Sequence, residues 1–463
     1  MRFFSASRVV RHWLCFCLVT GVLAGISLGE SGDALKEGWP EQEQYELYKL
    51  LVDTIDQVER NYVKDVDRRE LFEAAIRGVL GTLDPYSAYI GREELRQFRT
   101  SVESEFGGIG IQIALEDGRL KVLSPLVGTP AYRAGVLAGD WIVEIDGSST
   151  KGITIDEAVK RLKGEPGTMV KLAIISEGAS EKRTVEVARE KIHIETVLGD
   201  HRDEDDAWSY FLDDRDRIGY VRLTAFSRDT TGELQHALQK LKAGNARGLI
   251  LDLRFNPGGL LSAAIEVADL FISEGRIVST KGRNSPERVW DAKSNAVFEN
   301  VPMVVLVNRY SASASEIVAA CLQDNKRALI AGERTWGKGS VQNVIELEDG
   351  ASALKLTTAS YRRPSGKNIH RFNDSDENGQ WGVIPDEGYE LKLDGTELAN
   401  LMQDRRERDI VRPRSATAST DAGGESKPAE EPSGAAAGPP RTVADRQLEL
   451  AVKHLTAELA RVD

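Results

Sequence analysis

The sequence is poor in the residues that build metal and redox sites. Its 463 residues include three cysteines and six histidines, and neither a CxxC nor an HExxH pattern occurs. Cys15 and Cys17 fall in an N-terminal apolar stretch, so the rest of the chain holds only Cys321 and cannot form an internal disulfide. These absences argue against a zinc site and a dithiol redox site. We therefore expect no metal and no cofactor.

Two further absences exclude other function classes. The chain has no GxxxxGK[ST] segment, which excludes a P-loop. It also lacks a basic balance, because the formal net charge is −13 and the pI is about 5.2. A general nucleic-acid binder carries a basic face, so we expect no nucleic-acid partner. Apolar residues at 41 % and charged residues at 29 % are ordinary for a globular protein, and the length allows two or three domains.

Residues 1–29 have the pattern of a targeting segment. Arg2, Arg8 and Arg11 precede an apolar stretch from Trp13 to Leu28, which is short for a membrane span of ~20 residues. Small residues ending at Ala24 or Gly29 could mark a cleaved signal peptide, and an uncleaved anchor is the alternative. Both predict an exported protein of the bacterial periplasm or cell envelope, with contact to the inner membrane only through such an anchor.

Hydrophobic periodicity divides the remaining chain into five segments. Residues 41–105 show helical spacing as far as about Phe98, residues 106–190 hold short strand-like runs, and residues 191–395 alternate strands and helices. The alternation favours an α/β core with a mostly parallel sheet. Residues 413–440 have the Pro, Gly, Ser, Ala and Glu content of a disordered linker. Residues 441–463 predict a final helix, where Thr442 and Asp445 are spaced as a capping box.

The strand-rich segment contains a glycine turn, Gly108-Ile109-Gly110-Ile111, and the run AGVLAGDWIVEIDG. Glycines let successive N–H groups converge on an anion, and an extended peptide can add as a strand at an open sheet edge. The segment resembles a PDZ domain. The resemblance implies that residues 108–111 bind a C-terminal carboxylate, while Ile111 and Ile113 line a pocket for an apolar terminal side chain. Arg133 either senses bound peptide or is simply a solvated arginine.

Three serines, Ser311, Ser313 and Ser315, follow the apolar run VPMVVLV and precede a predicted helix. A serine nucleophile needs a proton acceptor and a site for the oxyanion. His370 has no obvious orienting acid in its sequence neighbourhood, which weakens a Ser–His–Asp triad. Lys338 lies between two glycines, and burial against the nearby Trp336 indole would lower its pKa. The residues alone leave open a simple turn, either base, and any of the three serines.

Several segments resemble the carboxy-terminal processing proteases, the tail-specific serine peptidases of family S41. They include NRYSASASEI, RALIAGERTWGKGSVQ and LILDLRFNPGG, and the resemblance runs in order from about Tyr45 to Leu455 with the PDZ-like segment inside it. It implies Ser313 as the nucleophile, Lys338 as the general base and Gln342 as the residue that orients the lysine. The polar stretch 371–381 departs from the simplest family pattern and concerns substrate access.

The same resemblance implies an oxyanion hole made by the Ala314 N–H and one N–H of Gly258-Gly259. Such a site is physically reasonable here, because a strand-to-helix exit leaves N–H groups free and glycines allow a second backbone to approach. Ser311 and Ser315 then serve packing and helix capping.

We therefore predict a multidomain α+β protein. Its parts are a helical N-terminal domain (41–105), a β-rich PDZ domain (106–190), a crotonase- or ClpP-like α/β protease core (191–395), and a C-terminal helix (441–463) after the linker. The predicted activity is that of an exported serine endopeptidase that cleaves proteins near their C-termini, with PDZ recognition of unstructured substrate tails and PDZ gating. The alternatives are a catalytically silent peptide-binding scaffold on the same fold, and a PDZ scaffold joined to an α/β domain of another chemistry. The helical ends are candidates for homodimerisation.

Overall fold

The computed structural model describes residues 40–95, 98, 105–213, 215–293, 296–372, 375–376, 379–411, 441 and 443–462. The predicted targeting segment 1–29 and linker 413–440 lie outside the described residues. Contacts divide the chain into two compact units, Met1–Ala74 and Ala75–Asp463. This division does not test the predicted domain boundaries, which stay predictions.

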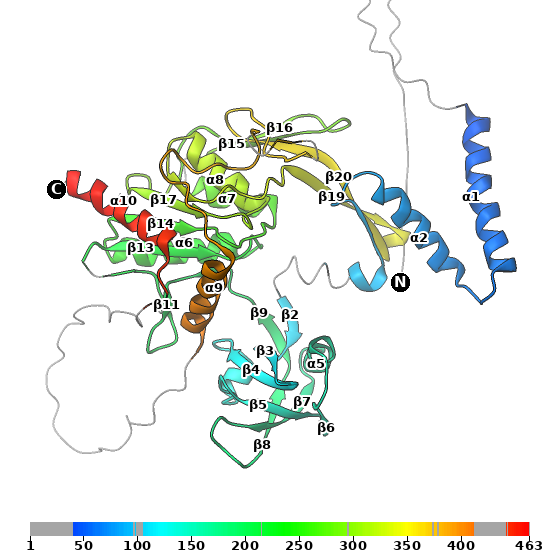
Figure 1. The fold of residues 1–463 in the computed structure, drawn as a ribbon, viewed down its shortest axis with the longest axis horizontal. Helices are drawn as coiled ribbons and strands as arrows, with labels where there is room; N and C mark the ends of the chain where they lie inside the picture. The colour runs from blue at the N-terminus through cyan, green and yellow to red at the C-terminus, as the bar shows by residue number, and fades with distance from the viewer. Residues whose placement is uncertain are drawn as a thin grey trace, which may run out of the picture. The chain divides into compact units, whose positions relative to one another are not determined.

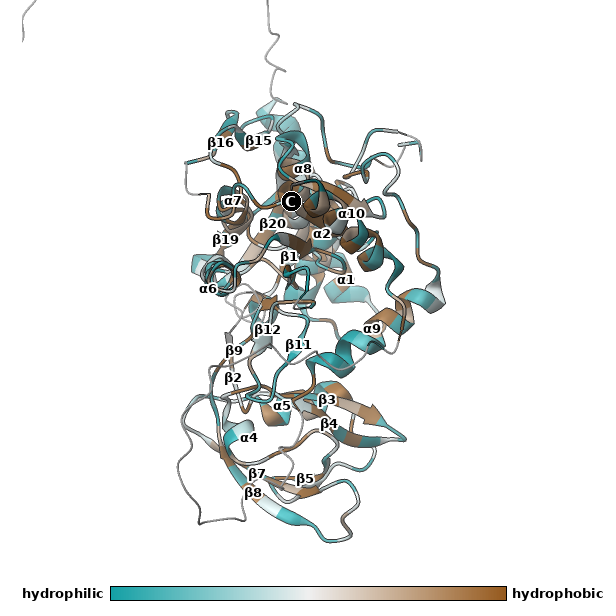
Figure 2. Ribbon diagram, turned by 90° about the vertical axis from the view of Figure 1, so that its left-hand side faces the viewer, coloured by the Kyte–Doolittle hydropathy of each residue, from teal (hydrophilic) through white to brown (hydrophobic). Residues whose placement is uncertain are grey.

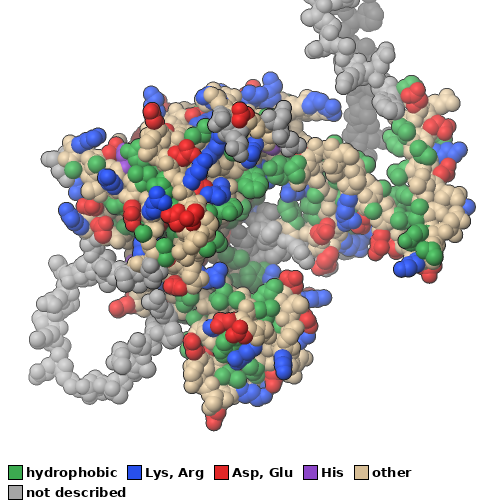
Figure 3. Space-filling view, in the orientation of Figure 1, with side chains coloured by type: hydrophobic (Ala, Val, Ile, Leu, Met, Phe, Trp, Pro, Cys, Tyr) green, Lys and Arg blue, Asp and Glu red, His purple; other side chains and the backbone are tan. Residues whose placement is uncertain are grey.

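Two helices begin the described chain, α1 (Glu41–Asn61) and α2 (Arg68–Gly81), as Figure 1 shows. In α1 only Ile55 is buried. The apolar side chains that α1 exposes are Tyr45, Leu47, Tyr48, Leu50, Leu51 and Val52. Figure 3 shows these green side chains interleaved with charged ones along the helix. A concentrated exposed apolar surface of this kind marks an interaction site.

The expectation of helix throughout residues 41–98 is wrong at one place. Residues Ala88–Ile90 form a short strand, β1, which pairs antiparallel with the long strand β20 (Ser352–Arg362). Tyr89 and Ile90 are buried by this pairing. A partner more than 250 residues away decides the local conformation here, and periodicity in the sequence carries no information on such a partner.

Residues 105–193 form the PDZ-like domain. Its strands are β2 (Glu105–Gly108), β3 (Ile111–Glu116), β4 (Arg119–Pro125), β5 (Trp141–Ile145), β6 (Ser148–Ser149), β7 (Met169–Ile175), β8 (Arg183–Ala188) and β9 (Glu190–His193), and its helices are α4 (Pro130–Arg133) and α5 (Ile155–Leu162). The main sheet has the order β3-β4-β5-β7-β8, with β6 on β5, and β2 pairs with β9. Since β3 is an edge strand of the main sheet, it offers the open side that strand addition needs.

The α/β core is built on a sheet with the order β10-β13-β14-β17-β18. Its strands are β10 (Val197–Leu198), β13 (Ile218–Leu223), β14 (Gly248–Asp252), β17 (Met303–Val307) and β18 (Leu329–Gly332); β10 is antiparallel to β13 and the other neighbours pair in parallel. Leu249 and Leu251 of β14 pack with one hydrophobic cluster, whereas Ile250 packs with another on the opposite face. Burial on both faces explains the unbroken apolar runs in the sequence.

Three helices supply the first of these clusters: α6 (Thr230–Ala243), α7 (Leu261–Asp269) and α8 (Ala314–Asp324). A second sheet has the order β1-β20-β15-β16, with β19 on β20; its further members are β15 (Arg276–Lys281), β16 (Arg288–Asp291) and β19 (Ser340–Leu347). The remaining elements are the hairpin β11 (His201–Arg202) and β12 (Trp208–Ser209), a 3-10 turn (Glu348–Gly350) and α9 (Gly395–Asp409). Figure 2 shows α6 and α9 largely teal, as expected of helices with one solvated side.

The C-terminal helix α10 (Arg446–Val462) covers the second face of the core sheet. Leu448, Ala451, Leu455 and Leu459 follow one another at spacings of three and four and join the cluster that contains Ile250. The predicted capping box is wrong in its register. The helix begins at Arg446, so Asp445 is itself the N-cap, and its Oδ1 accepts the Leu448 N–H at 3.1 Å. Thr442 lies outside the described residues.

Asp445 also neutralises a fully buried arginine of the core. Arg254 donates from Nη1 to Asp445 Oδ1 at 2.8 Å and from Nη2 to Asp445 Oδ2 at 2.7 Å. Its Nε and Nη2 also donate to Asp252, and Nη1 donates to Gln447 Oε1 at 3.0 Å. Burial by itself would raise the pKa of Asp445, but the Arg254 charge and hydrogen bonds outweigh it and lower the pKa. The end of the chain is thus tied to the strand exit at residue 254 by ionic hydrogen bonds.

We expect Asp445→Ala to lower the free energy of unfolding by about 3–5 kcal/mol, because it leaves a buried guanidinium with one carboxylate fewer. Arg446→Ala is the matched control. It breaks the exposed ion pair between Arg446 of α10 and Glu397 of α9, which solvent screens, so it should cost far less. Denaturant unfolding of both variants measures the difference, and equal losses would contradict the role of Asp445. Because the folded pKa of Asp445 is lowered, this stabilisation is present above the unfolded value of ~3.9 and is lost as the pH falls below it.

Candidate active site

Ser313 lies in the turn between β17 and α8 in a strained backbone conformation. Its φ is 56° and its ψ is −112°, a region that residues with a Cβ rarely adopt. Strain of this kind concentrates at functional sites. Ser313 is the N-cap of α8, where free N–H groups favour negative charge. Tyr361 is buried, and burial raises the pKa of its hydroxyl to about 12, against an opposing effect of Ser313.

The two flanking serines have structural hydrogen bonds. Ser311 Oγ donates to the Leu253 carbonyl at 2.8 Å, and Ser315 Oγ donates to the Asn256 carbonyl at 2.9 Å. Both side chains are fully buried. They tie the serine turn to the LRFNPGG loop on either side of Ser313. Ser315 does not cap the helix, because the cap is Ser313 itself.

The glycine pair predicted for the oxyanion site lies directly beside the serine turn. A Cβ added to Gly258 would lie 2.8 Å from Ser313 Cβ and 3.0 Å from the Ala314 nitrogen. Gly258 and Gly259 have φ of 103° and 153°, which other residues avoid. The Gly258 N–H already donates to Asn256 Oδ1 at 2.9 Å. The close approach of the two backbones therefore requires glycine at position 258.

Lys338 is half-buried in the turn that precedes β19. Burial lowers its pKa, the nearby Lys355 lowers it further, and the Glu316 carboxylate opposes both. The predicted burial of Lys338 against the Trp336 indole stays a prediction, and Trp336 itself is 53 % exposed. The aromatic neighbour is Tyr86, whose ring centroid lies 5.0 Å from Lys338 Nζ. A residue far from Lys338 in sequence supplies this contact, so spacing within GERTWGKGSVQ does not reveal it.

Gln342 lies on strand β19, four residues after Lys338. Its Nε2 donates to Ser340 Oγ at 2.9 Å and to Thr357 Oγ1 at 3.2 Å. The Thr357 hydroxyl in turn donates to Asp84 Oδ1 at 3.2 Å. These bonds hold the amide nitrogen of Gln342 against Ser340 and Thr357. The amide oxygen therefore points the other way and can accept a hydrogen bond.

Glu316 connects the serine turn with the lysine turn, and the sequence reasoning missed it. Its Oε2 accepts the N–H groups of Ser313 and Lys338, each at 2.8 Å. Its Oε1 accepts the Thr335 hydroxyl at 2.5 Å and the Gly337 N–H at 2.7 Å. The residue is fully buried, and burial raises its pKa although all four donors favour the charged form. The signal was present in the sequence as Ser313-Ala-Ser-Glu316, an S-x-x-E capping box.

His370 does not form part of a triad in the described structure. Its Nδ1 is buried and has no hydrogen-bond partner among the described residues. Burial lowers the pKa of His370, with Asp84 opposing, and the ring stands edge-on to Phe372 at 4.8 Å. This environment does not orient an imidazole for proton transfer.

The residues predicted to bind peptide gather at one edge of the PDZ-like domain. Gly110 has φ 76°, and a Cβ there would lie 2.3 Å from Thr129 Cβ. Ile109 is buried in the domain core, whereas Ile111 and Ile113 are partly buried on the edge strand β3, after β2 ends at Gly108. Arg133 is exposed and pairs with Glu190 Oε1 at 2.5 Å, on the strand that leaves the domain.

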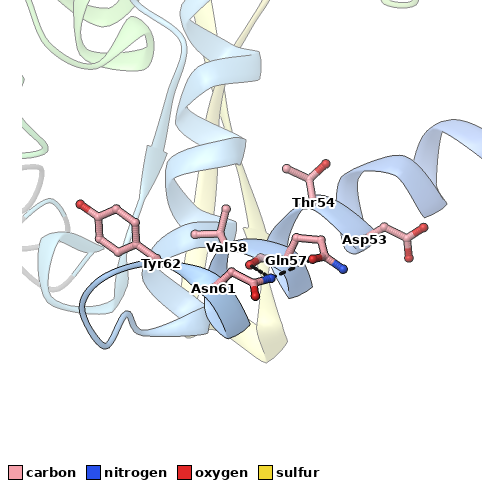
Figure 4. A pocket seen from close by; sticks show the side chains of 6 residues that line it. All are labelled: Asp53, Thr54, Gln57, Val58, Asn61 and Tyr62. Atoms are coloured by element: carbon pink, nitrogen blue, oxygen red, sulfur yellow. Dashed lines mark hydrogen bonds between the residues drawn. The ribbon is translucent and has the colours of Figure 1, made fainter.

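Three further observations concern other kinds of site. Figure 4 shows a shallow hollow on one side of α1, lined by Asp53, Thr54, Gln57, Val58, Asn61 and Tyr62, and it contains none of the groups described above. Among the described residues, no group of three or more His, Cys, Asp or Glu side chains could hold a metal ion. Within the same residues, no helix combines the length and the apolar character that crossing a membrane requires.

Comparisons with known proteins identify the parts of the chain. The model of peptidase family S41 matches residues 217–387, the PDZ domain model matches residues 121–176, and the model described as the activating protease CtpB N-terminal domain matches residues 28–94. The first range contains Ser313, Lys338 and Gln342.

Relatives extend the match over most of the chain. The carboxy-terminal-processing protease of Bartonella bacilliformis is 38 % identical over 84 % of this chain and 88 % of its own length. The carboxyl-terminal-processing protease of Synechocystis is 36 % identical over 83 % of this chain and 89 % of its own. A solved photosystem II D1 C-terminal processing protease is 33 % identical, over 75 % of this chain and 92 % of that one, with a TM-score of 0.42.

These matches confirm the predicted resemblance and the predicted fold class. They also confirm that the protein is a hydrolase of the serine peptidase type. With S41 and PDZ models in order along its length and a relative 38 % identical over 84 % of it, the chain belongs to the carboxy-terminal processing proteases of peptidase family S41.

Proposed function

We propose that the protein is an exported endopeptidase that cleaves proteins near their C-termini with a Ser313–Lys338 dyad. One observation carries this assignment: the buried Glu316 carboxylate accepts the backbone N–H of both Ser313 and Lys338. The carboxylate therefore fixes the backbone of the strained Ser313 and that of the half-buried Lys338 relative to each other. The lowered pKa of Lys338 supports its use as a base, because only the neutral amine can take a proton.

In this mechanism Lys338 takes the proton from Ser313 Oγ, which attacks the carbonyl carbon of the scissile peptide. The carbonyl oxygen becomes an oxyanion, and the Ala314 N–H at the start of α8 stabilises it. The C–N bond then breaks, and the Lys338 ammonium gives its proton to the leaving amine. A water molecule hydrolyses the acyl-enzyme in the same way, with Lys338 again as base.

The second oxyanion donor is the N–H of Gly259 rather than that of Gly258. The Gly258 N–H is engaged by Asn256 Oδ1. The hydrogen bonds to Phe226 are made by the residues on either side of Gly259. The Gly258 carbonyl accepts the Phe226 N–H, and the Leu260 N–H donates to the Phe226 carbonyl. This leaves the Gly259 N–H as the available donor of the pair.

The PDZ domain selects the substrate by its terminal carboxylate and an apolar last side chain. The turn at Gly108–Ile111 and the edge strand β3 with Ile113 provide the anion nest and the open edge. Arg133 of α4 pairs with Glu190 of β9, the last strand of this domain, and this ion pair is the contact through which peptide binding gates cleavage.

The same proposal includes export and self-association. The basic and apolar character of residues 1–29 supports export to the periplasm or cell envelope, with cleavage or anchoring of that segment. The exposed apolar side chains of α1 support a homodimer in which a second copy covers them, and sedimentation velocity distinguishes it from a monomer. Nucleic acid has no part in the function, in keeping with the net charge of −13.

Ser313→Ala and Lys338→Ala should each lower kcat/KM by at least about a thousandfold, because each removes a member of the catalytic unit. His370→Asn should keep most of the activity. The assay follows cleavage of a fluorogenic peptide with a free apolar C-terminus over pH. Activity should rise with pH through a value below the ordinary lysine pKa of ~10.4, since the lowered pKa makes the neutral amine available earlier. Cleavage by Ser313→Ala, or its loss in a folded His370→Asn variant, would contradict the proposed dyad.

Glu316→Gln should abolish most activity and destabilise the fold. Each carboxylate oxygen accepts two donors, so the new NH₂ group faces two donors whichever way it points, at about 1–3 kcal/mol for each donor left unpaired. Glu333→Gln is the matched control, since Glu333 is also buried and accepts from Arg309 and the Leu393 N–H. Both variants should unfold earlier. Only Glu316→Gln should lose activity at a temperature where both are folded, and a wild-type rate for it would refute the connection.

Amidation of the substrate C-terminus should slow cleavage by about tenfold to a hundredfold, if the PDZ domain binds the carboxylate by charge-assisted hydrogen bonds of about 1.5–3 kcal/mol. Arg133→Ala should reduce the preference for the free acid. Lys182→Ala, which breaks the exposed Lys182–Glu144 pair in the same domain, should leave it unchanged. Equal rates on acid and amide with the wild type would exclude tail recognition by its carboxylate.

A further inference from the structure

The turn Asp84–Ser87 reaches the active centre from outside the matched peptidase segment of residues 217–387. It lies between α2 and β1, and the pairing of β1 with β20 places Tyr89 opposite Leu354. Asp84 builds the turn itself. Its Oδ1 accepts the N–H groups of Tyr86 at 2.7 Å and Ser87 at 2.9 Å, and its Oδ2 accepts Ser87 Oγ at 2.8 Å. The turn is therefore well ordered by its own hydrogen bonds.

The Tyr86 ring faces the reacting nitrogen of Lys338. The 5.0 Å between Nζ and the ring centroid is within the ~6 Å range of a cation–π contact. Two neighbours hold the ring: Trp336 Nε1 donates to the Tyr86 hydroxyl at 3.4 Å, and the His370 ring stands at 66° to it with centroids 6.3 Å apart. The negative face of an aromatic ring attracts an ammonium group, so this contact both positions Lys338 and favours its charged form.

Asp84 also determines which way the amide of Gln342 points. An ionised carboxylate only accepts hydrogen bonds, so the Thr357 hydroxyl must donate to Asp84 Oδ1. The same hydroxyl oxygen is then an acceptor for Gln342 Nε2 at 3.2 Å. Ser87 Oγ fixes the backbone of Thr357 by accepting its N–H at 3.1 Å. This chain of donors keeps the Gln342 nitrogen turned toward Thr357 and leaves its oxygen to accept from an ammonium group.

We propose that the Asp84–Ser87 turn positions the general base: the Tyr86 ring carries the ammonium of Lys338, and Asp84 orients Gln342 through Thr357. This inference rests on the proposed Ser313–Lys338 chemistry and adds a segment to it. Asp84 and Tyr86 are positioning residues, because they act on the substrate only through Lys338 and Gln342. Both residues lie near the end of the matched range 28–94, so this end of the range contributes to the proposed catalytic centre.

The first test compares Tyr86→Phe with Tyr86→Leu in the full-length protein, using the fluorogenic peptide with a free apolar C-terminus. Tyr86→Leu should lower kcat about tenfold and move the rising limb of the pH profile down by about half a unit to one and a half units, because a ring that favours the charged amine is lost. Tyr86→Phe keeps the ring face and should keep the wild-type limb. The charged groups that act on Lys338, namely Lys355 of β20 and Glu316 of α8, are unchanged in both variants, as are His370, which contacts the Tyr86 ring, and Asp84, which acts on His370. Coincident pH profiles for the two variants would overturn the role of Tyr86.

The second test is a double-mutant cycle of Asp84→Asn and Thr357→Val, which does not depend on the Tyr86 variants folding. If Thr357 acts only with Asp84, each single change should lower kcat about tenfold or more with KM unchanged, and the double variant should be no slower than Asp84→Asn alone, since Asp84 also builds the turn that carries Tyr86. Asp67→Asn is the control, since Asp67 caps α2 through the Glu70 N–H and is remote in sequence from the base. Multiplicative losses in the double variant would overturn the relay. Failure of this inference is distinct from failure of the dyad: an active Lys338→Ala refutes the dyad, whereas an inactive Lys338→Ala beside coincident Tyr86 profiles refutes only the positioning role.

Discussion

The buried carboxylate of Glu316 is the interaction on which the active centre depends. The serine turn and the lysine turn are separate loops of the α/β core, and no continuous element joins them. Glu316 accepts four hydrogen bonds from these two turns and is completely excluded from water. A buried charge of this kind is tolerated only when its partners are complete. The geometry of the two turns is therefore all-or-none, since the loss of either turn would leave a charge without compensation.

A second ionic centre holds the loop that bears Gly258 and Gly259, the proposed oxyanion loop. Arg254 lies four residues before Gly258, and its guanidinium is shared by Asp252 and Asp445, the latter from the end of the chain. Tyr220 and Arg405 add further hydrogen bonds to Asp252, whose pKa is held well below its ordinary range by Arg254 and Arg405 against the effect of burial. The apolar face of α10 alone would cover the sheet. The ionic contacts add a fixed register between that helix and the loop that bears the glycines.

Features that depend on neighbouring residues, such as helices, strands and short motifs, can be predicted from the sequence. Contacts between segments far apart in the chain cannot. Continuous apolar runs and their spacing are sufficient for the parallel sheet and for the helices around it. The short motifs alone left three serines and two bases open, and only the resemblance to the S41 family implied Ser313, Lys338 and the Gly258-Gly259 pair. Glu316 was visible as a capping box, but three of its four donors come from residues 335–338. The strand at Ala88–Ile90 and the Tyr86 contact with Lys338 were beyond reach, because β20 lies more than 260 residues further on. Periodicity reports which face of an element is buried, but it does not report what covers that face.

The charge state of Lys338 shows how these distant contributions combine. Burial and the positive charge of Lys355 disfavour the ammonium, whereas Glu316 and the face of Tyr86 favour it. If burial acted alone, the lysine would be neutral but could not hold the proton that it takes from serine. If the favourable partners acted alone, it would stay charged and could not accept one. A base that must do both in each cycle needs a pKa between these limits. In this protein the opposing contributions come from α8, β20 and the turn before β1, so the pKa that the proposed base needs depends on the assembly of all three.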